Sequence, residues 1–463
     1  MDFNAVTPEF VAQLEAIVGQ EAVSTAHAER ELHSRDQSHH TAHLPDVVVY
    51  PTEAERVAAV LRLANEACIP VTPWGVGTGL EGNSIPLFGG VLLSLERMNR
   101  ILHVYADDFQ VVVQPGIGHK DLNQQLARTG LFFPPDPGAN ASVGGMLANN
   151  AAGIRTVRYG ASKDNVLKMQ VALADGRLIN IGSRSVKQSS GYDLLHLFVG
   201  SEGTLGVITE ATLKLVPIPV HMSAVVTAFA DVKAAVETVV AVRGSGLDPA
   251  ALELVDAAHC RMLREAEGVD LADYPTLFME FHAAQEASLD AGLEIVREIC
   301  EEMGAISFRA TTDPSERKKL WHARHHSYEI MVRSHPDRKF FINDVAVPIS
   351  SYPALIGYVE ELREEYRLTT YMIGHAGDGN VHVEFPYADE AEYQRAMAMN
   401  KKVVSRAIEL GGTATGEHGV GLGKIAYMAQ EHGESLDVMR TIKASLDPKG
   451  ILNPGKIFPA ITP

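Results

Sequence analysis

The stretch that decides the fold is TPWGVGTGLEGN at residues 72–83, where four glycines recur within eight residues. A β-prone run ends just before these glycines, and the next apolar run, VLLSL, begins at Val91. The glycine spacing formally matches GxGxxG, but a Rossmann dinucleotide site requires a helix directly after it. Here the chain continues through NSIP at 83–86 and then Gly89-Gly90. The order strand–loop–strand therefore excludes a Rossmann unit.

A different anion-binding geometry fits these glycines. Alternating glycines allow successive backbone N–H groups to turn inward around phosphate oxygens, because no side chain blocks the approach. Two further glycine clusters follow at residues 142–153 and 200–206. Any one cluster alone is most simply an ordinary turn. Three clusters in one region, each next to an apolar strand, favour a large bound cofactor that contains a diphosphate.

The same loops carry a family resemblance. WGVGTGLEG (74–82), DPGANASVGGMLANNAAG (136–153), RYG (158–160) and GSEGTLGVIT (200–209) resemble the flavin-binding domain of vanillyl-alcohol-oxidase-type FAD enzymes. The resemblance implies that the first loop binds the diphosphate of FAD and that the other loops surround the ribityl chain and ring. The residues that it assigns to FAD are Trp74, Gly75, Val76, Gly77, Thr78, Gly79, Leu80, Gly82, Asn83, Pro137, Ser142, Gly144, Gly145, Asn149, Gly153, Gly203, Ile208 and Asn453. No histidine lies between Cys68 and Arg100, so non-covalent FAD is expected.

A second motif predicts a metal site. In TTYMIGHAGDGNVHVEF (369–385), two β-prone runs flank Asp378-Gly379, which is a strong signal for a two-residue hairpin turn. If these two residues form the loop, His375 faces His382 across the strands, and Ile373 faces Glu384. A longer symmetric loop keeps this pairing, whereas a loop with an odd number of residues breaks it. Facing imidazoles are close enough to chelate one cation. We interpret Glu384 as a neighbouring acid that is not a ligand.

A third ligand is suggested by GGTATGEHGVGLGK (411–424), where Glu417 and His418 stand among glycines. Two histidines and one carboxylate suit Zn²⁺, Mn²⁺ or Fe²⁺ and leave positions open for a substrate.

GHAGDGNVH (374–382), TGEHGVGLGK (415–424) and LDPKGILNPGKIF (446–458) resemble the C-terminal domain of FAD-dependent D-2-hydroxyacid dehydrogenases. The chain is most similar to the D-lactate dehydrogenase (cytochrome) type, in which WHARHHSYE (321–329) also has a counterpart. The resemblance implies roles for six residues: His375, His382 and Glu417 as metal ligands, His418 as the base, Arg324 as the binder of the substrate carboxylate, and Asn380 as a residue bordering the substrate.

The two resemblances together predict an α+β protein. A two-part FAD-binding domain of the vanillyl-alcohol-oxidase (PCMH) type precedes an α+β substrate domain, or cap, with an antiparallel sheet. The expected boundaries are 1–41 for an N-terminal helical arm, 42–219 for the FAD-binding domain and 220–410 for the substrate- and metal-binding cap. Residues 411–463 form a C-terminal segment that is expected to complete the active site against the FAD domain.

Two departures from related enzymes bear on the substrate. Relatives that act on 2-hydroxyglutarate have a lysine where this chain has Ile342, and a threonine where it has Tyr328. Both differences argue against a dicarboxylate. The expected reaction is oxidation of a small D-2-hydroxy acid, with D-lactate first, to the 2-oxo acid. The preference for the D form rests on the resemblance alone.

Composition limits the partners. The 58 acidic and 40 basic residues give a net charge of −18, and no run of Lys and Arg occurs, which excludes nucleic acid. The three cysteines are far apart, so the chain supplies no iron–sulfur cluster. Electrons must therefore pass to an external acceptor such as a quinone, a cytochrome or an electron-transfer flavoprotein. Neither a membrane-spanning run nor a targeting leader is evident, which predicts a cytoplasmic protein; peripheral membrane association and a homodimer stay open.

Other interpretations remain open at this point. A metallohydrolase could use the His/His/Glu site, but it would leave the three glycine loops unexplained. A glycolate-oxidase-type catalytic subunit, a D-2-hydroxyglutarate dehydrogenase and a flavin-binding scaffold without turnover are the further alternatives.

Overall fold

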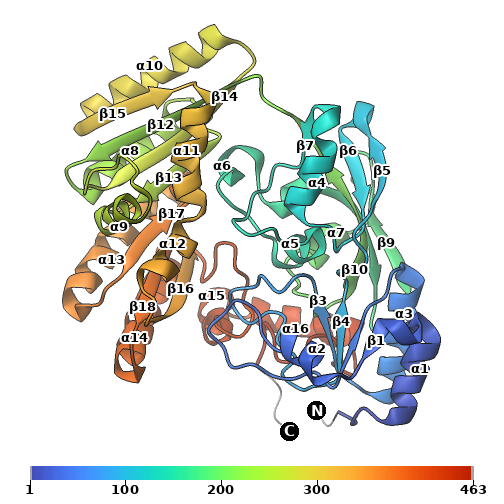
Figure 1. The fold of residues 1–463 in the computed structure, drawn as a ribbon. Coiled ribbons are helices and arrows are strands. Elements are labelled where there is room, and N and C mark those ends of the chain that lie inside the picture. The colour runs from blue at the N-terminus through green and yellow to red at the C-terminus, as the bar shows by residue number, and fades with distance from the viewer. Residues whose placement is uncertain (1–2, 460–463) are drawn as a thin grey trace. The chain divides into compact units, whose positions relative to one another are not determined.

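The computed structural model describes residues 3–459 of the chain. The chain forms two compact units. The first unit comprises residues 1–152, 161–217 and 417–463, and the second comprises residues 153–160 and 218–416. Each unit has its own sheets and its own hydrophobic core, and Figure 1 shows their elements.

The N-terminal part of the first unit is a four-stranded sheet in the order β1-β2-β4-β3, in which β2, β4 and β3 are parallel. Its strands are β1 (Val23–Ser24), β2 (Val47–Val49), β3 (Val71–Trp74) and β4 (Val91–Ser94). Its helices are α1 (Pro8–Val18), α2 (His27–Leu32) and α3 (Ala54–Ala67). Helix α3 buries Val57, Val60 and Leu61 from one face, as its three-to-four-residue apolar spacing requires. Strand β3 ends at Trp74, and the first glycine loop begins there.

The second sheet of the first unit is antiparallel, with five strands in the order β5-β6-β10-β8-β9. These strands are β5 (Ile101–Tyr105), β6 (Gln110–Val113), β8 (Val166–Ala172), β9 (Leu178–Gly182) and β10 (Val207–Lys214). A two-stranded ladder joins β7 (Leu131–Phe132) to β11 (Val216–Pro217). The helices of this part are α4 (His119–Leu126), α5 (Val143–Asn149) and α7 (Leu194–Phe198). The second glycine cluster opens α5, and the third lies between α7 and β10.

The C-terminal residues return to the first unit. Val71 of β3 forms a parallel bridge with Leu452, and Asn453 donates its backbone N–H to the carbonyl of Val71 at 2.8 Å. This segment contains α15 (Met428–His432) and α16 (Ser435–Leu446). Leu452 and Asn453 therefore lie beside the strand from which the first glycine loop emerges.

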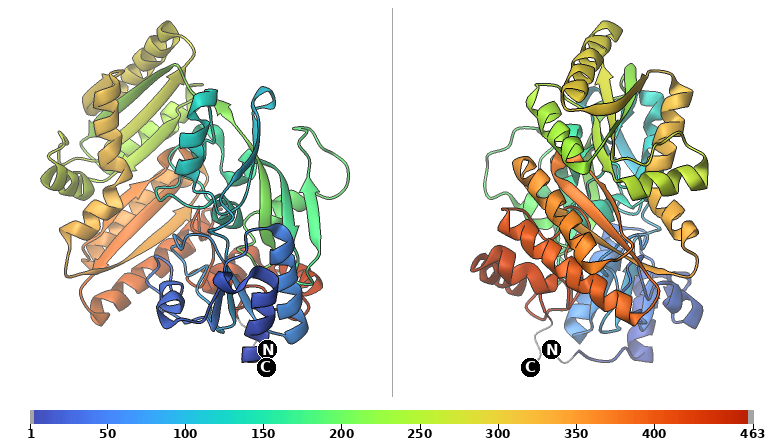
Figure 2. Two further views of the ribbon diagram at one scale, coloured as in Figure 1. Left: turned by 45° about the vertical axis from the view of Figure 1, so that its right-hand side comes forward. Right: turned by 90° about the vertical axis from the view of Figure 1, so that its left-hand side faces the viewer.

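The second unit is built on one antiparallel sheet of seven strands in the order β15-β12-β14-β13-β17-β18-β16. The strands are β12 (His221–Phe229), β13 (Ala251–Val255), β14 (Thr276–Ala283), β15 (Ala305–Thr311), β16 (Lys339–Ala346), β17 (Tyr371–Gly374) and β18 (Asn380–Tyr387). The helices are α6 (Thr156–Tyr159), α8 (Val232–Gly244), α9 (Ala257–Glu267), α10 (Glu286–Glu302), α11 (Pro314–His325), α12 (Ser327–Ser334), α13 (Tyr352–Tyr366) and α14 (Glu390–Glu409). Figure 2 shows helices on both faces of this sheet.

One face of this sheet forms a core with α9, α11 and α12. Val255, Phe278 and Ile373 from the strands pack with Trp321 of α11 and Ile330 of α12. The same face carries the polar residues of the site described below, because side chains alternate between the two faces of a strand.

The hairpin β17–β18 corrects the predicted register. The observed pairs are Ile373 with His382 and Tyr371 with Glu384, so His375 does not face His382 directly. The turn is longer than predicted. The backbone N–H of Asp378 donates to the carbonyl of His375 at 3.0 Å, and Gly379 follows with φ +71°. A type I turn followed by a left-handed glycine is a common four-residue hairpin loop. The pairing thus shifts by two residues, an even number, which leaves both histidines on one face.

We predict that Gly379→Ala destabilises the hairpin. A methyl group at this position would overlap the Val347 carbonyl, and the left-handed backbone adds about 1–3 kcal/mol for a residue other than glycine. Chemical denaturation should show this loss in the free energy of unfolding. Gly357→Ala is the matched control: Gly357 lies in α13 with open space around its Cα, so stability should be unchanged or higher by about 0.5–1 kcal/mol. Equal effects of the two substitutions would contradict the strained turn.

Candidate active site

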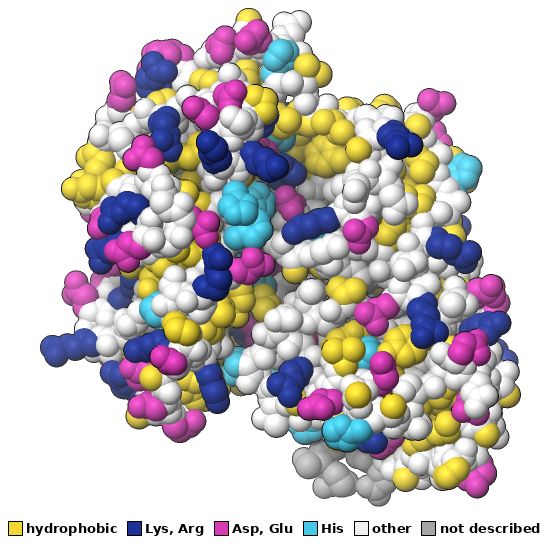
Figure 3. Space-filling view, in the orientation of Figure 1, with side chains coloured by type: hydrophobic (Ala, Val, Ile, Leu, Met, Phe, Trp, Pro, Cys, Tyr) yellow, Lys and Arg dark blue, Asp and Glu magenta, His cyan; other side chains and the backbone are white. Residues whose placement is uncertain are grey.

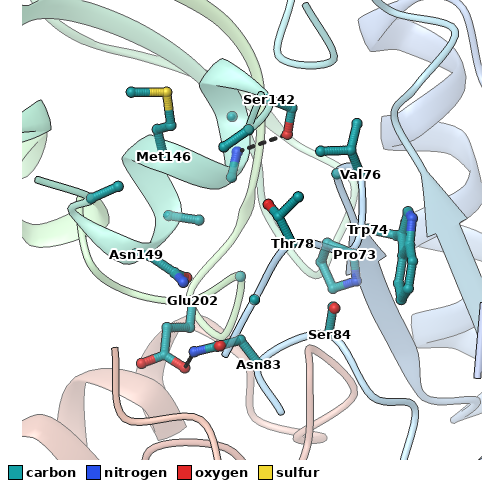
Figure 4. A pocket seen from close by; sticks show the side chains of 18 of the residues that line it. Pro73, Trp74, Val76, Thr78, Asn83, Ser84, Ser142, Met146, Asn149 and Glu202 are labelled. Carbon is teal, nitrogen blue, oxygen red and sulfur yellow. Dashed lines mark hydrogen bonds between the residues drawn. The ribbon is translucent and has the colours of Figure 1, made fainter. Parts of the chain in front are cut away.

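Residues of the three glycine loops line one pocket in the first unit. Every residue that the sequence assigned to FAD lines this pocket, except Gly82 and Gly153. Figure 4 shows the first loop, helix α5 and the third loop converging on one space. Residues that the sequence did not single out also line it, among them Pro73, Ser84, Met146 and Glu202.

Glycines contribute a large share of the residues that line this pocket. A Cβ on Gly75 would overlap the hydroxyl of Ser142, which accepts the N–H of Gly145 at 3.3 Å (Figure 4). Gly77 has φ +69°, and a Cβ there would overlap the ring of Trp74. No Lys or Arg is among the described residues that line the pocket. A diphosphate would therefore be bound by backbone N–H groups and hydroxyls, which fits the anion nest expected of these glycines.

Two predicted FAD contacts lie elsewhere. Gly82, with φ +76°, packs against Leu422 and His40 and is absent from the pocket wall. Gly153 begins the short segment 153–160 that belongs to the second unit. Both are glycines of the recognised motifs, but neither is among the residues that line the pocket.

Glu417 and His418 also line this pocket. The carbonyl of His418 accepts the side-chain N–H groups of Asn83 and Asn149, each at 3.4 Å. The predicted base is therefore tied by its main chain to the first and second glycine loops. Glu417 is the first residue of this C-terminal part and directly follows Gly416, the last residue of the second unit.

In the second unit, the two predicted histidine ligands lie close together. The ring centroids of His375 and His382 are 5.4 Å apart, with the planes at 87°. Both side chains are buried. Although they are not cross-strand partners, they occupy diagonal positions on one face, within reach of each other's side chains.

Behind each histidine stands a buried carboxylate. Both oxygens of Glu253 lie 2.9 Å from Nδ1 of His375, and Oδ1 of Asp344 lies 3.7 Å from Nδ1 of His382. A carboxylate accepts, so Nδ1 of His375 carries a proton, and Nε2 is the ring nitrogen that a cation could bind once the imidazole is neutral. The Glu253–His375 pair is of the kind that orients a metal-binding imidazole, whereas Asp344 lies near His382 beyond hydrogen-bond distance of its Nδ1. The donor set therefore fits a divalent cation.

Glu253 also binds Arg324. It lies in the middle of β13 and is fully buried, while Arg324 comes from α11 and is 7% exposed. Arg324 Nη2 donates to Glu253, and the buried Nε of Arg324 has no hydrogen-bond partner among the described residues. Burial raises the pKa of Glu253, but the charges of His375 and Arg324 outweigh it and hold this pKa below its usual range. The pair thus presents a buried guanidinium with an open N–H edge.

Asn380 lies on the same face of the sheet. Its amide donates to Asp344 Oδ1 at 2.7 Å and to the carbonyl of Val345 at 3.0 Å. Asp344 also accepts the hydroxyl of Thr415 at 2.8 Å. Asp344 therefore holds the side chain of Asn380 and, through Thr415, the chain that leads to Gly416. A Cβ on Gly416 would overlap the Asn380 amide.

Glu384 is the next polar residue along β18. It pairs across the sheet with Ile342 and with Tyr371, and burial raises its pKa to about 8. Its Oε2 lies 3.7 Å from Nδ1 of the buried His259.

Comparisons with known proteins identify the family. The family described as "FAD binding domain" matches residues 45–182, and the family described as "FAD linked oxidases, C-terminal domain" matches residues 218–457. The chain is 39% identical over 461 residues to "Probable D-lactate dehydrogenase, mitochondrial" of Danio rerio, covering 98% of this chain and 93% of the relative. It is 38% identical to "D-lactate dehydrogenase [cytochrome], mitochondrial" of Arabidopsis thaliana, covering 99% and 81%.

It is also 32% identical to "Glycolate oxidase subunit GlcD" of Bacillus subtilis, covering 98% of this chain and 97% of that subunit. The solved structure of p-cresol methylhydroxylase with substrate bound superposes with a TM-score of 0.81 at 18% identity, covering 99% of this chain and 98% of that one.

The chain belongs to the FAD-linked oxidases, and the α+β fold predicted from the glycine loops is confirmed. It is an FAD-dependent oxidoreductase of the D-lactate dehydrogenase type, as the sequence resemblance predicted.

The surface shown in Figure 3 agrees with the composition. On this face, Lys and Arg side chains are interspersed with Asp and Glu, and the described residues form no continuous basic patch. No described helix has the length and apolar content needed to span a bilayer.

Sequence reasoning missed Glu253 and Glu202. Each is a buried acid in an otherwise apolar or glycine-rich stretch, ALELV (251–255) and GSEG (200–203). A charged residue in the middle of a buried strand is a usable signal, because it must have a partner.

We predict that Gly75→Ala weakens FAD binding. The added methyl group displaces the Ser142 hydroxyl from its place at the start of α5, and overpacking typically costs about 1–3 kcal/mol. We expect the dissociation constant of FAD to rise roughly 5- to 100-fold. Titration of the apoprotein with FAD, followed by flavin fluorescence, measures this. Ser142→Ala removes the hydroxyl alone and should give a smaller rise; a larger one would contradict steric blocking by the methyl group.

Proposed function

We propose that the protein oxidises a small D-2-hydroxy acid, with D-lactate first, to the 2-oxo acid and passes the electrons to an external acceptor. The observation that carries this proposal is the buried Arg324. Its Nε–H has no hydrogen-bond partner among the described residues, and its Nη2 donates to Glu253, which also binds His375. Such a group suits an anionic substrate beside a cation, because a guanidinium and a carboxylate match geometrically.

The residues divide the work as follows. Arg324 binds the substrate carboxylate and fixes which face of C2 is presented. Asn380 borders the substrate, and Asp344 holds its amide in place. His418 takes the hydroxyl proton, because imidazole has a pKa near neutrality and a general base typically contributes a factor of about 10²–10⁴. Bound FAD supplies the two-electron acceptor for the hydrogen on C2.

A divalent cation would be held by His375, His382 and Glu417. The Glu253 carboxylate bonded to His375 supports this assignment, as does the covalent link that holds the Glu417 Cα about 3.8 Å from that of Gly416. Gly416 itself packs against Asn380 and Asp344. When bound, Zn²⁺, Mn²⁺ or Fe²⁺ would lower the pKa of the substrate hydroxyl.

The surroundings of His382 support a monocarboxylate. Ile342 pairs with Glu384 two residues beyond the pair Asp344–His382, on the same face. A second substrate carboxylate near these residues would meet an isoleucine, a buried acid and no Lys or Arg from this face of the two strands. D-Lactate, which has only a methyl group there, avoids this cost. The D preference rests on the named relatives.

We infer an external acceptor because the three cysteines lie too far apart in the sequence to form an iron–sulfur motif within this chain. Cys260 and Cys300 are buried, and burial raises the pKa of Cys300 to about 11, so neither is a reactive thiol. A cytochrome is supported by the name of the Arabidopsis relative; a quinone or an electron-transfer flavoprotein is the alternative. The Bacillus relative supports a second candidate, a glycolate-oxidase-type subunit that works within a complex.

The deciding experiment is an assay of the purified protein with a dye acceptor. We expect a yellow protein whose FAD is released by acid precipitation, and the highest kcat/KM for D-lactate among D-lactate, L-lactate, glycolate and D-2-hydroxyglutarate. A colourless protein would favour a metallohydrolase. A higher kcat/KM for D-2-hydroxyglutarate would overturn the substrate assignment, and activity only with added partner subunits would favour the glycolate-oxidase-type complex.

We predict that metal affinity depends on Glu253. Glu253→Gln removes the carboxylate that holds His375, and loss of such a partner typically costs roughly 10- to 100-fold in metal affinity. Titration of chelator-treated protein with Mn²⁺ or Zn²⁺ measures it without any turnover. Glu280→Gln is the matched control, since Glu280 is an equally buried acid that binds His282 and Arg155 on the same sheet. Equal losses in the two variants would contradict a specific role for Glu253.

A further inference from the structure

The third glycine loop carries a buried carboxylate that the proposed chemistry does not use. Glu202 lines the FAD pocket and is 5% exposed. Its backbone has φ +51°, a left-handed conformation that is costly for any residue other than glycine. Such strain persists where the surrounding contacts over-determine the conformation, and it is common at functional sites.

The contacts of Glu202 lead to the chain just after His418. Oε1 accepts the N–H of Val420 at 2.7 Å, and Oε2 accepts the N–H of Gly421 at 2.9 Å. Oε2 also accepts the amide of Asn83 at 2.8 Å, a bond that Figure 4 shows. Asn83 in turn donates to the carbonyl of His418. One carboxylate therefore binds the main chain on the C-terminal side of His418, and its partner Asn83 binds His418 itself.

The loop is shaped around this carboxylate. Gly419 has φ +82°, and a Cβ there would come within 3.0 Å of Glu202 Oε1 and 2.9 Å of the Asn83 amide. Asn453 closes the group by donating to the carbonyls of Asn83 and Glu202 at 2.9 and 2.7 Å. The three segments that meet here are the first glycine loop, the third glycine loop and the C-terminal segment.

Burial of this acid has a cost that its contacts offset only in part. Desolvation holds the pKa of Glu202 above its usual range, although the bonds from Asn83, Val420 and Gly421 and the charge of Lys456 act in the opposite direction. An apolar side chain would avoid that cost but could not accept two backbone N–H groups. The acid is thus suited to holding main chain, not to exchanging protons with a substrate.

We propose that Glu202 is a positioning residue that holds the main chain of His418 at the FAD pocket. The proposal rests on the function proposed above for His418. Glu202 acts through Val420, Gly421 and Asn83, so its loss should lower kcat more than it changes KM. It should also loosen the loop in a way that can be measured without turnover.

The test is Glu202→Gln in the FAD-loaded protein. The glutamine side chain has one oxygen and one NH₂ group in place of the two carboxylate oxygens. Its NH₂ group cannot accept a hydrogen bond, so at least one of the bonds from Val420, Gly421 and Asn83 is lost. We expect hydrogen exchange of a peptide covering 417–424 to accelerate roughly 10-fold or more, because a bond to a charged group is lost. We expect kcat with D-lactate to fall by a similar factor, with KM changed less than about threefold, while the flavin spectrum and FAD content stay as in the wild type.

Asp447→Asn is the matched control. Asp447 is also a buried acid of the C-terminal segment, and it accepts the N–H groups of Ile451 and Leu452 at 3.1 and 2.8 Å. Its loss should accelerate exchange around 447–452 and leave kcat within about twofold of the wild type. If Glu202→Gln yields no soluble protein, Glu202→Asp replaces it in the test. The aspartate keeps the charge but is one methylene shorter, so its kcat should lie below that of the wild type and its exchange of residues 417–424 should be faster, each by less than expected for Glu202→Gln.

Unchanged exchange and unchanged kcat in Glu202→Gln would overturn the proposal. A fall in kcat without faster exchange would also overturn it, because Glu202 would then act directly. If the wild-type protein oxidised no 2-hydroxy acid, the proposed function would fail, whereas the exchange of residues 417–424 would still show whether Glu202 holds this loop.

Discussion

The contact on which the proposed chemistry depends is the one between Glu253 and its two partners, His375 and Arg324. A lone carboxylate in the middle of a buried strand would be strongly destabilising, and so would a lone guanidinium from a neighbouring helix. Each is tolerated because the other is present. The consequence is that one acid sets which nitrogen of His375, the proposed metal ligand, is protonated and how Arg324, the proposed binder of the substrate carboxylate, is directed.

The sequence predicted those parts of the protein in which chemistry restricts residue choice. The glycine loops were recognisable because only glycine permits close approach of main chain to a cofactor, and their pocket contains nearly all of the assigned residues. The exceptions are informative. Gly82 and Gly153 belong to the same motifs, but a glycine required by its own backbone conformation or packing cannot be told, from sequence, from a glycine required by a ligand.

The hairpin shows why the two histidines lie on one face although the predicted register is wrong. The sequence predicts a two-residue turn at Asp378-Gly379, whereas Gly379 is the left-handed residue that ends a longer loop. An error of one residue in the register would have moved His382 to the opposite face, but the actual difference is two. The two imidazoles lie on one face because the register differs by an even number of residues, although His375 and His382 are not cross-strand partners. Glu202 and Glu253 were missed for another reason: their partners lie far away in the chain, so no local pattern reveals them.

Under the proposed function, the two units would recognise their ligands by different means, and this has a consequence for specificity. In the first unit many of the residues that line the pocket are glycines, where an added side chain would disturb FAD binding itself. In the second unit the face around His382 consists of separate side chains on neighbouring strands, such as Ile342 and Glu384, each of which can change without altering the register of the sheet. Since the side chain opposite Glu384 can become basic or apolar while Asp344 still stands opposite His382, one scaffold can retain its oxidation chemistry and still change which 2-hydroxy acid it accepts.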